Sequence, residues 1–473
     1  MSVGVNTAVD HTSASTIPSW VRHAIIYQIF PERFENGDRS NDPPNTQPWG
    51  TKPTGGSFFG GDLEGVLNRL PYLTDLGITT IYFNPVFSAS SNHKYNATDY
   101  LKIDPAFGTN DLFKTLVDTC HKAGIRILID GVFNHVGTAF FAFVDVKKNG
   151  AASRYAEWFN IFSYPVSDPR TPNYEGWWGY GSLPKLMVAH PDVQRYLFDV
   201  ARYWTGLGID GWRLDVPNDV PHAFWKEWRK VVRSVNPECY IVGELWQDAS
   251  PWLKGDEFDA TMNYRFRDAC VDFFAHKTTT GVEFQKSLAA TRALYSEESN
   301  DAMMNLIGSH DTERFLTMCK GDVHALRLAA LFQMTYPGAP TVYYGDEVGM
   351  EGGKDPDCRR TMIWDQSKWD KDLHAYYRSL IALRKKYEAL RTGAYAALPV
   401  PEDLSRCVAF ERTLGSERFI IAINDDRRKA ALSFTVSKDL RSVNSLVDGV
   451  KIDVRSGQLS ITLQPRDACI IQC

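Results

Sequence analysis

Short runs of apolar residues alternate with longer amphipathic runs over most of the chain. Helical patterns, with apolar residues at every third or fourth position and a glycine at the end, cover residues 63–77, 110–124 and 191–208. Runs typical of buried strands occupy residues 25–30, 78–85, 125–135, 208–216, 239–245, 258–264, 303–311 and 340–347. Eight strand–helix units predict an α/β fold whose parallel sheet closes into a (β/α)8 barrel (a TIM barrel), rather than an open doubly wound sheet.

Two regions depart from this alternation. The segment between the third and fourth predicted strands is rich in Trp, Tyr, Gly and Pro and is far longer than an ordinary βα loop, so we expect an inserted subdomain there. After a helical pattern at 372–390, short alternating runs predict a C-terminal antiparallel β-sandwich, and these runs are 407–414, 418–425, 430–436, 457–463 and 468–473. The predicted domains are a lead segment 1–19, a barrel 20–135 and 190–391, an insert 136–189 and a sandwich 392–473.

Composition excludes several classes of partner. The formal net charge of -5 provides no basic field for nucleic acid or an anionic membrane surface. No apolar run approaches the length of a membrane span, the first 16 residues lack a signal-peptide pattern, and eight scattered cysteines without a CxxC favour reduced thiols. We therefore expect a cytoplasmic protein with no nucleic-acid or membrane partner. Aromatic residues, at 13%, suit either a large core or stacking surfaces for sugar rings.

Polar and charged residues collect where the predicted strands end. In a (β/α)8 barrel the active site lies at the carboxyl ends of the strands. These residues are Asp130, Asn134 and His135 on the third strand, Arg213 and Asp215 on the fourth, Glu244 on the fifth, and His310 and Asp311 on the seventh. One such residue is common by chance, but this many on one rim indicate an active site.

Three of these acids suit a retaining glycosidase, which needs a nucleophile, an acid/base and stabilisation of positive charge on the sugar. We assign Asp215 as the nucleophile and Glu244 as the general acid/base. Arg213 lies two residues before Asp215, hence on the same strand face, and should help to keep it ionised. Asp311 should hold the substrate's hydroxyls, with neutral His135 and His310 as hydrogen-bond donors to the same sugar.

Four motifs carry a resemblance to a known family. They are "DGVFNH" (130–135), "GWRLDV" (211–216), "GELW" (243–246) and "LIGSHD" (306–311). In this order they resemble the four signature regions of the α-amylase superfamily of glycoside hydrolases. Further stretches, such as "HKYNATDY" (93–100) and "DPDCRRTMIW" (355–364), resemble the cyclomaltodextrinase, neopullulanase and maltogenic amylase subfamily.

The resemblance implies a retaining hydrolase of α-1,4 bonds in cyclodextrins, maltooligosaccharides, pullulan or starch, with some transglycosylation and no organic cofactor. It also implies substrate-binding residues. The sugar at the cleavage site would be framed by His93 and Tyr95, together with His135, Arg213 and His310. The next sugar on the non-reducing side would be bound by Asp355 and Arg359. The leaving-group side would be lined by Val216 and Trp246. A core tryptophan is the alternative for Trp246.

The sequence also departs from that subfamily. Met187 stands where an asparagine is usual and Gln247 where a histidine is usual, which could change linkage preference. Strand one begins by residue 25, leaving no room for the N-terminal β-sandwich of the subfamily, so we expect a monomer, or a dimer through another surface. The cleft should then be open and accept polysaccharides better than in the longer relatives. An α-glucosidase or glucan transferase is the alternative activity. A non-catalytic carbohydrate-binding protein is the remote one, because all three acids are present.

An Asn/Asp-rich stretch near the first strand suggests a cation. Its oxygen donors suit calcium, with no Cys or His for zinc, and the resemblance also implies a structural Ca²⁺ there. The candidate ligands are the side chains of Asn36, Asp38, Asn41, Asp42 and Asp62 and the carbonyl of Gly60. The alternative is a turn without an ion, since Asn, Asp and Gly also build turns.

Overall fold

Eight parallel strands form the central sheet of the computed structural model, which describes residues 17–473 except 441, 444, 448 and 449. They are β1 (Ile26–Ile29), β2 (Thr80–Phe83), β5 (Arg126–Gly131), β6 (Gly211–Leu214), β7 (Tyr240–Gly243), β8 (Ala260–Thr261), β9 (Met304–Leu306) and β10 (Ala339–Tyr343). The order is β8-β7-β6-β5-β2-β1-β10-β9, and a parallel bridge from Met262 to Met304 joins the two edges. The predicted barrel is confirmed, with strands shorter than the apolar runs because the chain turns into βα loops before each run ends.

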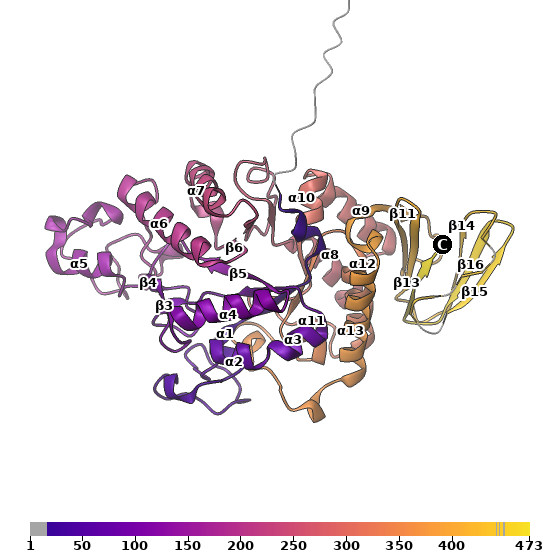
Figure 1. Cartoon of the computed structure of the whole chain (residues 1–473), viewed down its shortest axis with the longest axis horizontal. Helices are drawn as coiled ribbons and strands as arrows, with labels where there is room; N and C mark the ends of the chain where they lie inside the picture. The colour runs from indigo at the N-terminus through magenta and orange to yellow at the C-terminus, as the bar shows by residue number, and fades with distance from the viewer. Residues whose placement is uncertain (1–16, 441, 444, 448–449) are drawn as a thin grey trace, which may run out of the picture.

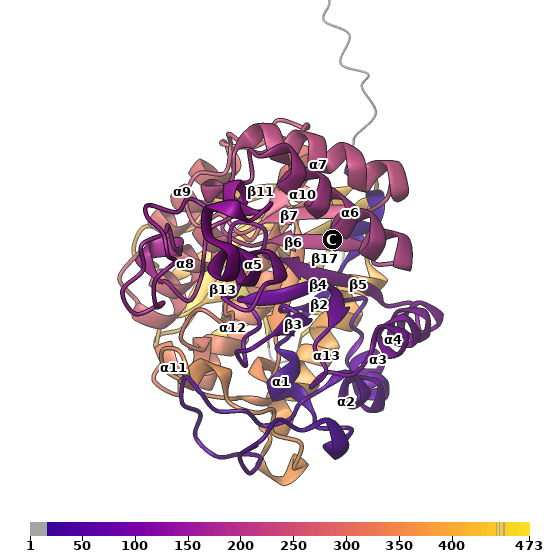
Figure 2. The same ribbon diagram turned by 90° about the vertical axis from the view of Figure 1, so that its left-hand side faces the viewer.

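Helices surround these strands on the outside (Figure 2). They are α1 (Pro31–Phe34), α2 (Leu63–Asn68), α3 (Leu70–Leu76), α4 (Asn110–Lys122), α6 (Pro191–Leu207), α7 (His222–Val235), α8 (Tyr264–Cys270), α9 (Gly281–Arg292), α10 (Glu297–Ala302), α11 (Phe315–Met318), α12 (Val323–Thr335), α13 (Lys371–Lys386) and α14 (Ala389–Thr392). The single helix expected over 63–77 is wrong: it is split into α2 and α3, because Pro71 has no N–H to continue the first helix. Among the described residues, no helix has the length and apolar content needed to cross a bilayer.

A short antiparallel pair, which the sequence pattern did not predict, precedes the third barrel strand. Strands β3 (Phe87–Ala89) and β4 (Ala97–Ile103) pair with each other, and the connection between them carries His93 and Tyr95. Lys94, between those two residues, has a left-handed backbone (φ 63°) and a buried ion pair of 2.8 Å with Asp104. The Lys94–Asp104 ion pair therefore anchors the β3–β4 connection, which faces the ends of the barrel strands.

The predicted insert and the C-terminal sheets lie at opposite ends of the molecule (Figure 1). The insert holds α5 (Phe141–Asn149) and short turns, and a bridge between His135 and Lys185 joins it to the end of a barrel strand. At the other end, a four-stranded sheet packs against a three-stranded one around its own apolar core, confirming the predicted sandwich. The sheets consist of β11 (Ala394–Leu398), β12 (Cys407–Leu414), β13 (Glu417–Asn424) and β17 (Asp467–Gln472), and of β14 (Ala430–Thr435), β16 (Gln458–Leu463) and β15 (Lys451–Arg455).

Two strands of the sandwich were missed. Strand β11 is the sequence AYAAL, whose alternation is weak because alanine is small and most of the strand is exposed. Strand β15 has too few apolar residues to stand out as a run. The predicted lead segment 1–19 lies, up to residue 16, outside the described residues.

Candidate active site

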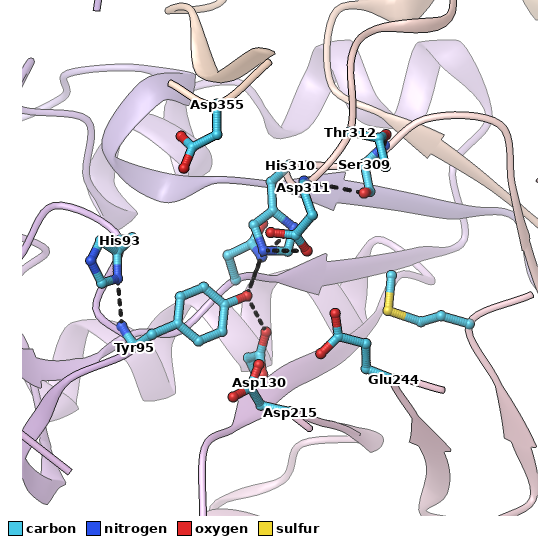
Figure 3. Close-up of polar contacts among 12 residues, drawn as sticks. His93, Tyr95, Asp130, Asp215, Glu244, Ser309, His310, Asp311, Thr312 and Asp355 are labelled. Atoms are coloured by element: carbon cyan, nitrogen blue, oxygen red, sulfur yellow. Dashed lines mark hydrogen bonds and ion pairs between the residues drawn. The ribbon is translucent and has the colours of Figure 1, made fainter. Parts of the chain in front are cut away.

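The side chain of Arg213 is the centre of the rim formed by the strand ends. It is fully buried on β6, and its Nη1 donates to Asp130 (2.8 Å to Oδ1 and 3.0 Å to Oδ2) and to Asp215 Oδ1 (2.9 Å). Its Nη2 lies 2.9 Å from Glu244 Oε2, an ion pair without hydrogen-bond alignment. Asp130 is on β5, Asp215 follows β6 and Glu244 follows β7, so three neighbouring strands bring three carboxylates to one guanidinium. Figure 3 shows these three carboxylates at the ends of the strands.

One cation shared by three buried carboxylates leaves a net negative cluster. Burial raises the pKa of Asp215 well above its usual range, Arg213 opposes this, and the charges of Glu244 and Asp130 add to it. The expectation that Arg213 keeps Asp215 ionised is therefore met only in part, because the guanidinium is divided among three acids. The ionised form of Asp215 is favoured when a proton is held elsewhere in the cluster.

His310 is held by amide groups that the sequence reasoning did not single out. The Nε2 of Gln28 lies 2.8 Å from His310 Nδ1, and the Nδ2 of Asn84 lies 3.1 Å from the same atom. Because amide nitrogens can only donate, Nδ1 must accept, and the imidazole proton is placed on Nε2. Burial lowers the pKa of His310 well below its usual value, so the ring is neutral.

Tyr95 continues this hydrogen-bond chain toward the nucleophile. Its hydroxyl lies 2.7 Å from His310 Nε2 and donates to Asp130 Oδ2 at 3.0 Å, and its ring is parallel to that of His310 (5°). The hydroxyl of Tyr82, another residue that was not predicted, donates to the same Asp130 oxygen at 2.7 Å. The chain of donors thus ends on the carboxylate that shares Arg213 with Asp215 (Figure 3).

Asp311 lies between the histidine and the segment after β10. Its Oδ2 is 3.1 Å from His310 Nε2, and its Oδ1 is 3.2 Å from Arg359 Nη2. Arg359 also donates from Nε to the His310 carbonyl (2.8 Å) and pairs through Nη1 with Asp355 (3.2 Å). Removal from water raises the pKa of Asp311, as does the charge of Glu244. The structure therefore brings these predicted residues together, with Asp355 half-exposed at the edge.

Trp246 and Val216 lie beside Glu244. The Trp246 indole donates to Glu244 Oε1 (3.1 Å), stacks on Tyr264 at a centroid distance of 3.7 Å and keeps 41% of its surface exposed, so it is not a core residue. The Val216 amide is 3.3 Å from Glu244 Oε2. Val216 was expected in a strand, but it has a left-handed backbone (φ 36°), a strained conformation for a β-branched side chain. Both residues therefore fix the Glu244 carboxylate. The half-exposed Met187 belongs to the insert.

His135 faces the aromatic part of the insert. Its ring stacks on Trp177 (5.1 Å), which donates to Asp219 Oδ2 (3.0 Å) and stacks in turn on Trp178, 80% exposed. Burial lowers the pKa of His135 to about 3, and its Nε2 has no hydrogen-bond partner among the described residues. A buried neutral imidazole with an unused nitrogen is suited to a polar group of a substrate.

His93, the remaining residue of the predicted substrate site, lies beside Tyr95. Its ring is 5.8 Å from the Tyr95 ring, and its Nδ1 accepts from the Tyr95 amide at 3.1 Å. Burial lowers its pKa to about 4, so it is also neutral near pH 7. The three histidines of the rim are thus uncharged hydrogen-bonding groups.

Two oxygen atoms of the predicted calcium loop lack hydrogen-bond partners within the described residues. The Oδ1 atoms of Asn36 and Asn41 are buried and have no hydrogen-bond partner within the described part of the chain. Asp42 Oδ1 accepts from Asn36 Nδ2 (2.7 Å), and a Cβ on Gly60 would lie 2.1 Å from that Asp42 oxygen, so glycine (φ +79°) is required there. These orphaned oxygens are what a hard cation would satisfy, so this part of the set fits calcium.

The other two candidate ligands already have hydrogen bonds. Asp62 accepts from the amides of Gly37, Asp38 and Gly65 (3.1, 2.8 and 2.6 Å) and caps α2, while Asp38 accepts from the Ser40 amide. Asp62 Oδ1 accepts from two of these amides, and Asp62 Oδ2 accepts from the Asp38 amide and, at 3.4 Å, from Asn41 Nδ2. Over the described residues, no group of three or more His, Cys, Asp or Glu could by itself hold a metal, so an ion here would need the side-chain amide and backbone carbonyl oxygens in addition to the aspartates.

The chain is similar to known proteins in both sequence and structure. The model of the family "Alpha amylase, catalytic domain" matches residues 28–370. A cyclomaltodextrinase of Geobacillus thermopakistaniensis is 47% identical over 95% of this chain and 76% of its own length, and neopullulanase 2 of Thermoactinomyces vulgaris is 46% identical over 98% and 80%. The solved structure of a cyclic α-maltosyl-(1→6)-maltose hydrolase from Arthrobacter globiformis is similar with a TM-score of 0.89 and 38% identity, over 97% of this chain and 99% of that chain.

The neutral state of His135 predicts a pH dependence of stability. Unfolding returns its pKa from about 3 to the ordinary 6.5, so below about pH 6.5 the unfolded chain takes up a proton that the folded chain refuses. Stability is therefore lost as the pH falls, by about 2 kcal/mol from this residue at pH 5. We expect the drop in melting temperature between pH 7.5 and pH 5 to be smaller in His135→Gln than in the wild type. His276→Gln, on a side chain 49% exposed, is the control. Equal drops in all three proteins would contradict the assignment.

Proposed function

Because the chain belongs to the α-amylase family of glycoside hydrolases, we propose that it is a retaining α-glucan hydrolase that cleaves α-1,4 bonds in cyclodextrins, maltooligosaccharides, pullulan or starch. The observation that carries the mechanism is the position of Asp215 and Glu244, each 2.9 Å from a nitrogen of Arg213. Sharing one guanidinium is compatible with the separation of about 5–5.5 Å between the two carboxyl groups of a retaining enzyme.

The first step forms a glycosyl ester. Asp215 attacks the anomeric carbon as the bond to the leaving oxygen breaks, and Glu244 gives that oxygen its proton. In the second step Glu244 takes a proton from water, the hydroxide attacks the anomeric carbon, and Asp215 leaves as a carboxylate. An acceptor hydroxyl in place of water gives transglycosylation. When the proton lies on another acid of the cluster, that acid no longer repels the negative charge of Asp215, so the ionised nucleophile is favoured.

The surrounding residues are proposed to hold one sugar at the cleavage point. The Tyr95 ring offers a stacking face, and the neutral His135 Nε2, without a partner among the described residues, would bond a sugar hydroxyl. His310 Nε2 contacts the Tyr95 hydroxyl and Asp311, and would share its N–H with a hydroxyl of the same sugar. His93 frames the same sugar beside Tyr95. Asp311 accepts hydroxyl hydrogens and favours positive charge on the ring in the transition state.

The neighbouring sugars are assigned to the two sides of this position. On one side, Arg359 bridges Asp311 to Asp355, so it links the cleavage position to the next sugar on the non-reducing side. On the leaving-group side, the exposed Trp246 ring provides a stacking surface and its N–H holds Glu244. Val216 lines the same side.

A second candidate activity is hydrolysis of cyclic maltosyl-maltose. The Arthrobacter globiformis hydrolase, which is similar over nearly all of both chains, is named for that substrate. Its structure has also been solved in complex with cyclic maltosyl-maltose. Met187 and Gln247 are the positions where linkage preference could differ. Chromatography of the products from β-cyclodextrin, pullulan, starch and cyclic maltosyl-maltose, side by side, separates these activities from an α-glucosidase, which releases glucose, and from a transferase, which makes longer products.

Calcium is proposed as a structural ion. Asn36, Asn41 and Asp42 would hold it with the Gly60 carbonyl, and Asp38 and Asp62 would complete the set. When bound, the ion would neutralise the acidic loop and tie residues 36–42 to residues 60–62. No step of the reaction passes through it.

The cellular context is also a proposal. An intracellular maltogenic amylase of Bacillus subtilis is 44% identical over 86% of this chain, which supports a cytoplasmic location. The free cysteines, buried except for the half-buried Cys473, are consistent with a reducing compartment. The monomer expected from the sequence stays a prediction, which light scattering tests.

Removing either catalytic acid tests the mechanism. We expect Asp215→Asn and Glu244→Gln each to lower kcat on maltooligosaccharides by at least about 10³-fold, since each change deletes a chemical step. With α-maltosyl fluoride, whose leaving group needs no protonation, Glu244→Gln should regain formation of the glycosyl ester and Asp215→Asn should not. Circular dichroism checks that both variants fold. A variant that keeps a tenth of the wild-type kcat would lose its assigned role.

Chelation tests the ion. We expect a chelator to lower the melting temperature and added Ca²⁺ to restore it. The free energy of unfolding should rise by about 2.7 kcal/mol when the free ion is at 100 times its Kd. Activity at low temperature should survive chelation, because the loop lies outside the catalytic cluster. Asn41→Ala is the matched variant and should respond to neither addition. A wild-type melting temperature that is unchanged by the chelator would refute calcium at this loop.

A further inference from the structure

A hollow of about 890 Å³ lies outside the catalytic cluster, between the loop that follows β1 and the loop that follows β10. Its volume is within the range of about 300–1,000 Å³ of ligand sites in proteins. One wall includes Gln47 and Trp49, the other includes Glu351 and Trp364, and Arg69 lies between them. Both loops lie at the bottom of the view in Figure 2, on the side of the barrel where the strands end.

Direct contacts between the two loops keep this hollow formed. The indole N–H of Trp49 donates to the Met362 carbonyl (2.9 Å), and the Gly50 amide donates to Thr361 Oγ1 (3.0 Å). At the base, the Arg69 guanidinium lies 4.0 Å from the centre of the Trp364 ring. Arg69 Nη2 also donates to both oxygens of Glu35 (3.1 Å each). A site whose walls are already joined costs a ligand little ordering free energy.

The chemistry of the lining favours an uncharged polyhydroxylated ligand. Cationic and acidic side chains are mixed in the lining, so the hollow presents no surface of a single charge to an anion or a cation. They are Arg39, Arg69, Arg360, Lys368, Glu35, Glu351, Asp365 and Asp42, the last of which also belongs to the proposed calcium loop. The half-buried Trp49 indole supplies an apolar face of the kind on which the C–H faces of sugars pack, while the Trp364 ring lies under Arg69. The exposed Gln47 and Glu351 side chains add an amide and a carboxylate that can exchange hydrogen bonds with sugar hydroxyls.

The hollow and the catalytic rim share one segment of the chain. The Arg359 side chain points to the rim, where it contacts His310 and Asp311. The next residues, Arg360 and Thr361, line the hollow. Because neighbouring residues of one segment face the two sites, a long ligand bound in the hollow would remain close to the cleavage point.

We propose that this hollow is a second α-glucan site, which holds part of a polysaccharide while another part occupies the catalytic cleft. The identity of the ligand rests on the proposed function, since the α-glucan is taken to be the substrate. Short oligosaccharides do not need the second site, because they cannot occupy both at once with the same chain. The site should therefore raise kcat/KM for starch and leave that for maltotriose unchanged.

Calorimetric titration of the inactive Asp215→Asn protein with maltoheptaose tests the site directly. We expect two molecules bound per chain, and one after Trp49→Ala is added. Trp20→Ala is the matched control, because Trp20 is also half-buried and its indole N–H donates to a backbone carbonyl at 2.9 Å. It should keep two. Gln47→Ala combined with Glu351→Ala changes exposed side chains on opposite walls, with no risk to folding, and should weaken one site about tenfold.

Kinetics of the same changes in the active protein complete the test. Gln47→Ala/Glu351→Ala and Trp49→Ala should lower kcat/KM for starch three- to tenfold and leave that for maltotriose within twofold. One bound maltoheptaose in the Asp215→Asn protein, together with unchanged starch kinetics in the double variant, would overturn the second site alone. No maltoheptaose bound at all would instead overturn the proposed function.

Discussion

The active site depends on a single buried cation that three acids share. Arg213 has no exposed surface, and its nitrogens lie within 3.0 Å of Asp130, Asp215 and Glu244. A cluster with more acids than cations is costly to bury, and burial raises the pKa of both Asp215 and Asp130 although each contacts Arg213. This cost is useful for catalysis, because it favours one shared proton in the cluster. The reaction needs one ionised acid as the nucleophile and one protonated acid as the acid/base.

The rest of the rim is arranged around that cluster. Amide groups of Gln28 and Asn84, both buried in the barrel, direct the His310 proton to Nε2 and toward Tyr95, and the Tyr95 hydroxyl ends on Asp130. The same donors thereby place a neutral imidazole beside Asp311 and satisfy the acid that competes with Asp215 for Arg213. Orientation and charge are set together by residues on β1, at the end of β2 and in the β3–β4 connection.

The sequence predicted the eight barrel strands and the acids at their ends, because a buried strand leaves a dense apolar run and a charged residue interrupts it visibly. Gln28 and Asn84 interrupt such runs in the same way, and Tyr82 has its hydroxyl within one, but their partners lie on other segments. Only the closed barrel shows which atoms meet. Local chemistry also hid some elements: Pro71 divides a helix whose apolar periodicity is continuous, and the alanine-rich β11 has little alternation. The hollow between two loops more than 300 residues apart has no local signal at all.

The central claim, that one guanidinium must serve three carboxylates at once, is tested most directly by Arg213→Lys. Lysine keeps the positive charge, but its compact ammonium cannot present several donors in a fixed plane to three acids. We expect kcat on maltooligosaccharides to fall by about 100-fold or more, as misplacement of reacting groups by an ångström does, while circular dichroism shows the native fold. A folded Arg213→Lys protein with kcat within a few-fold of the wild type would show that charge alone suffices, and would contradict this account.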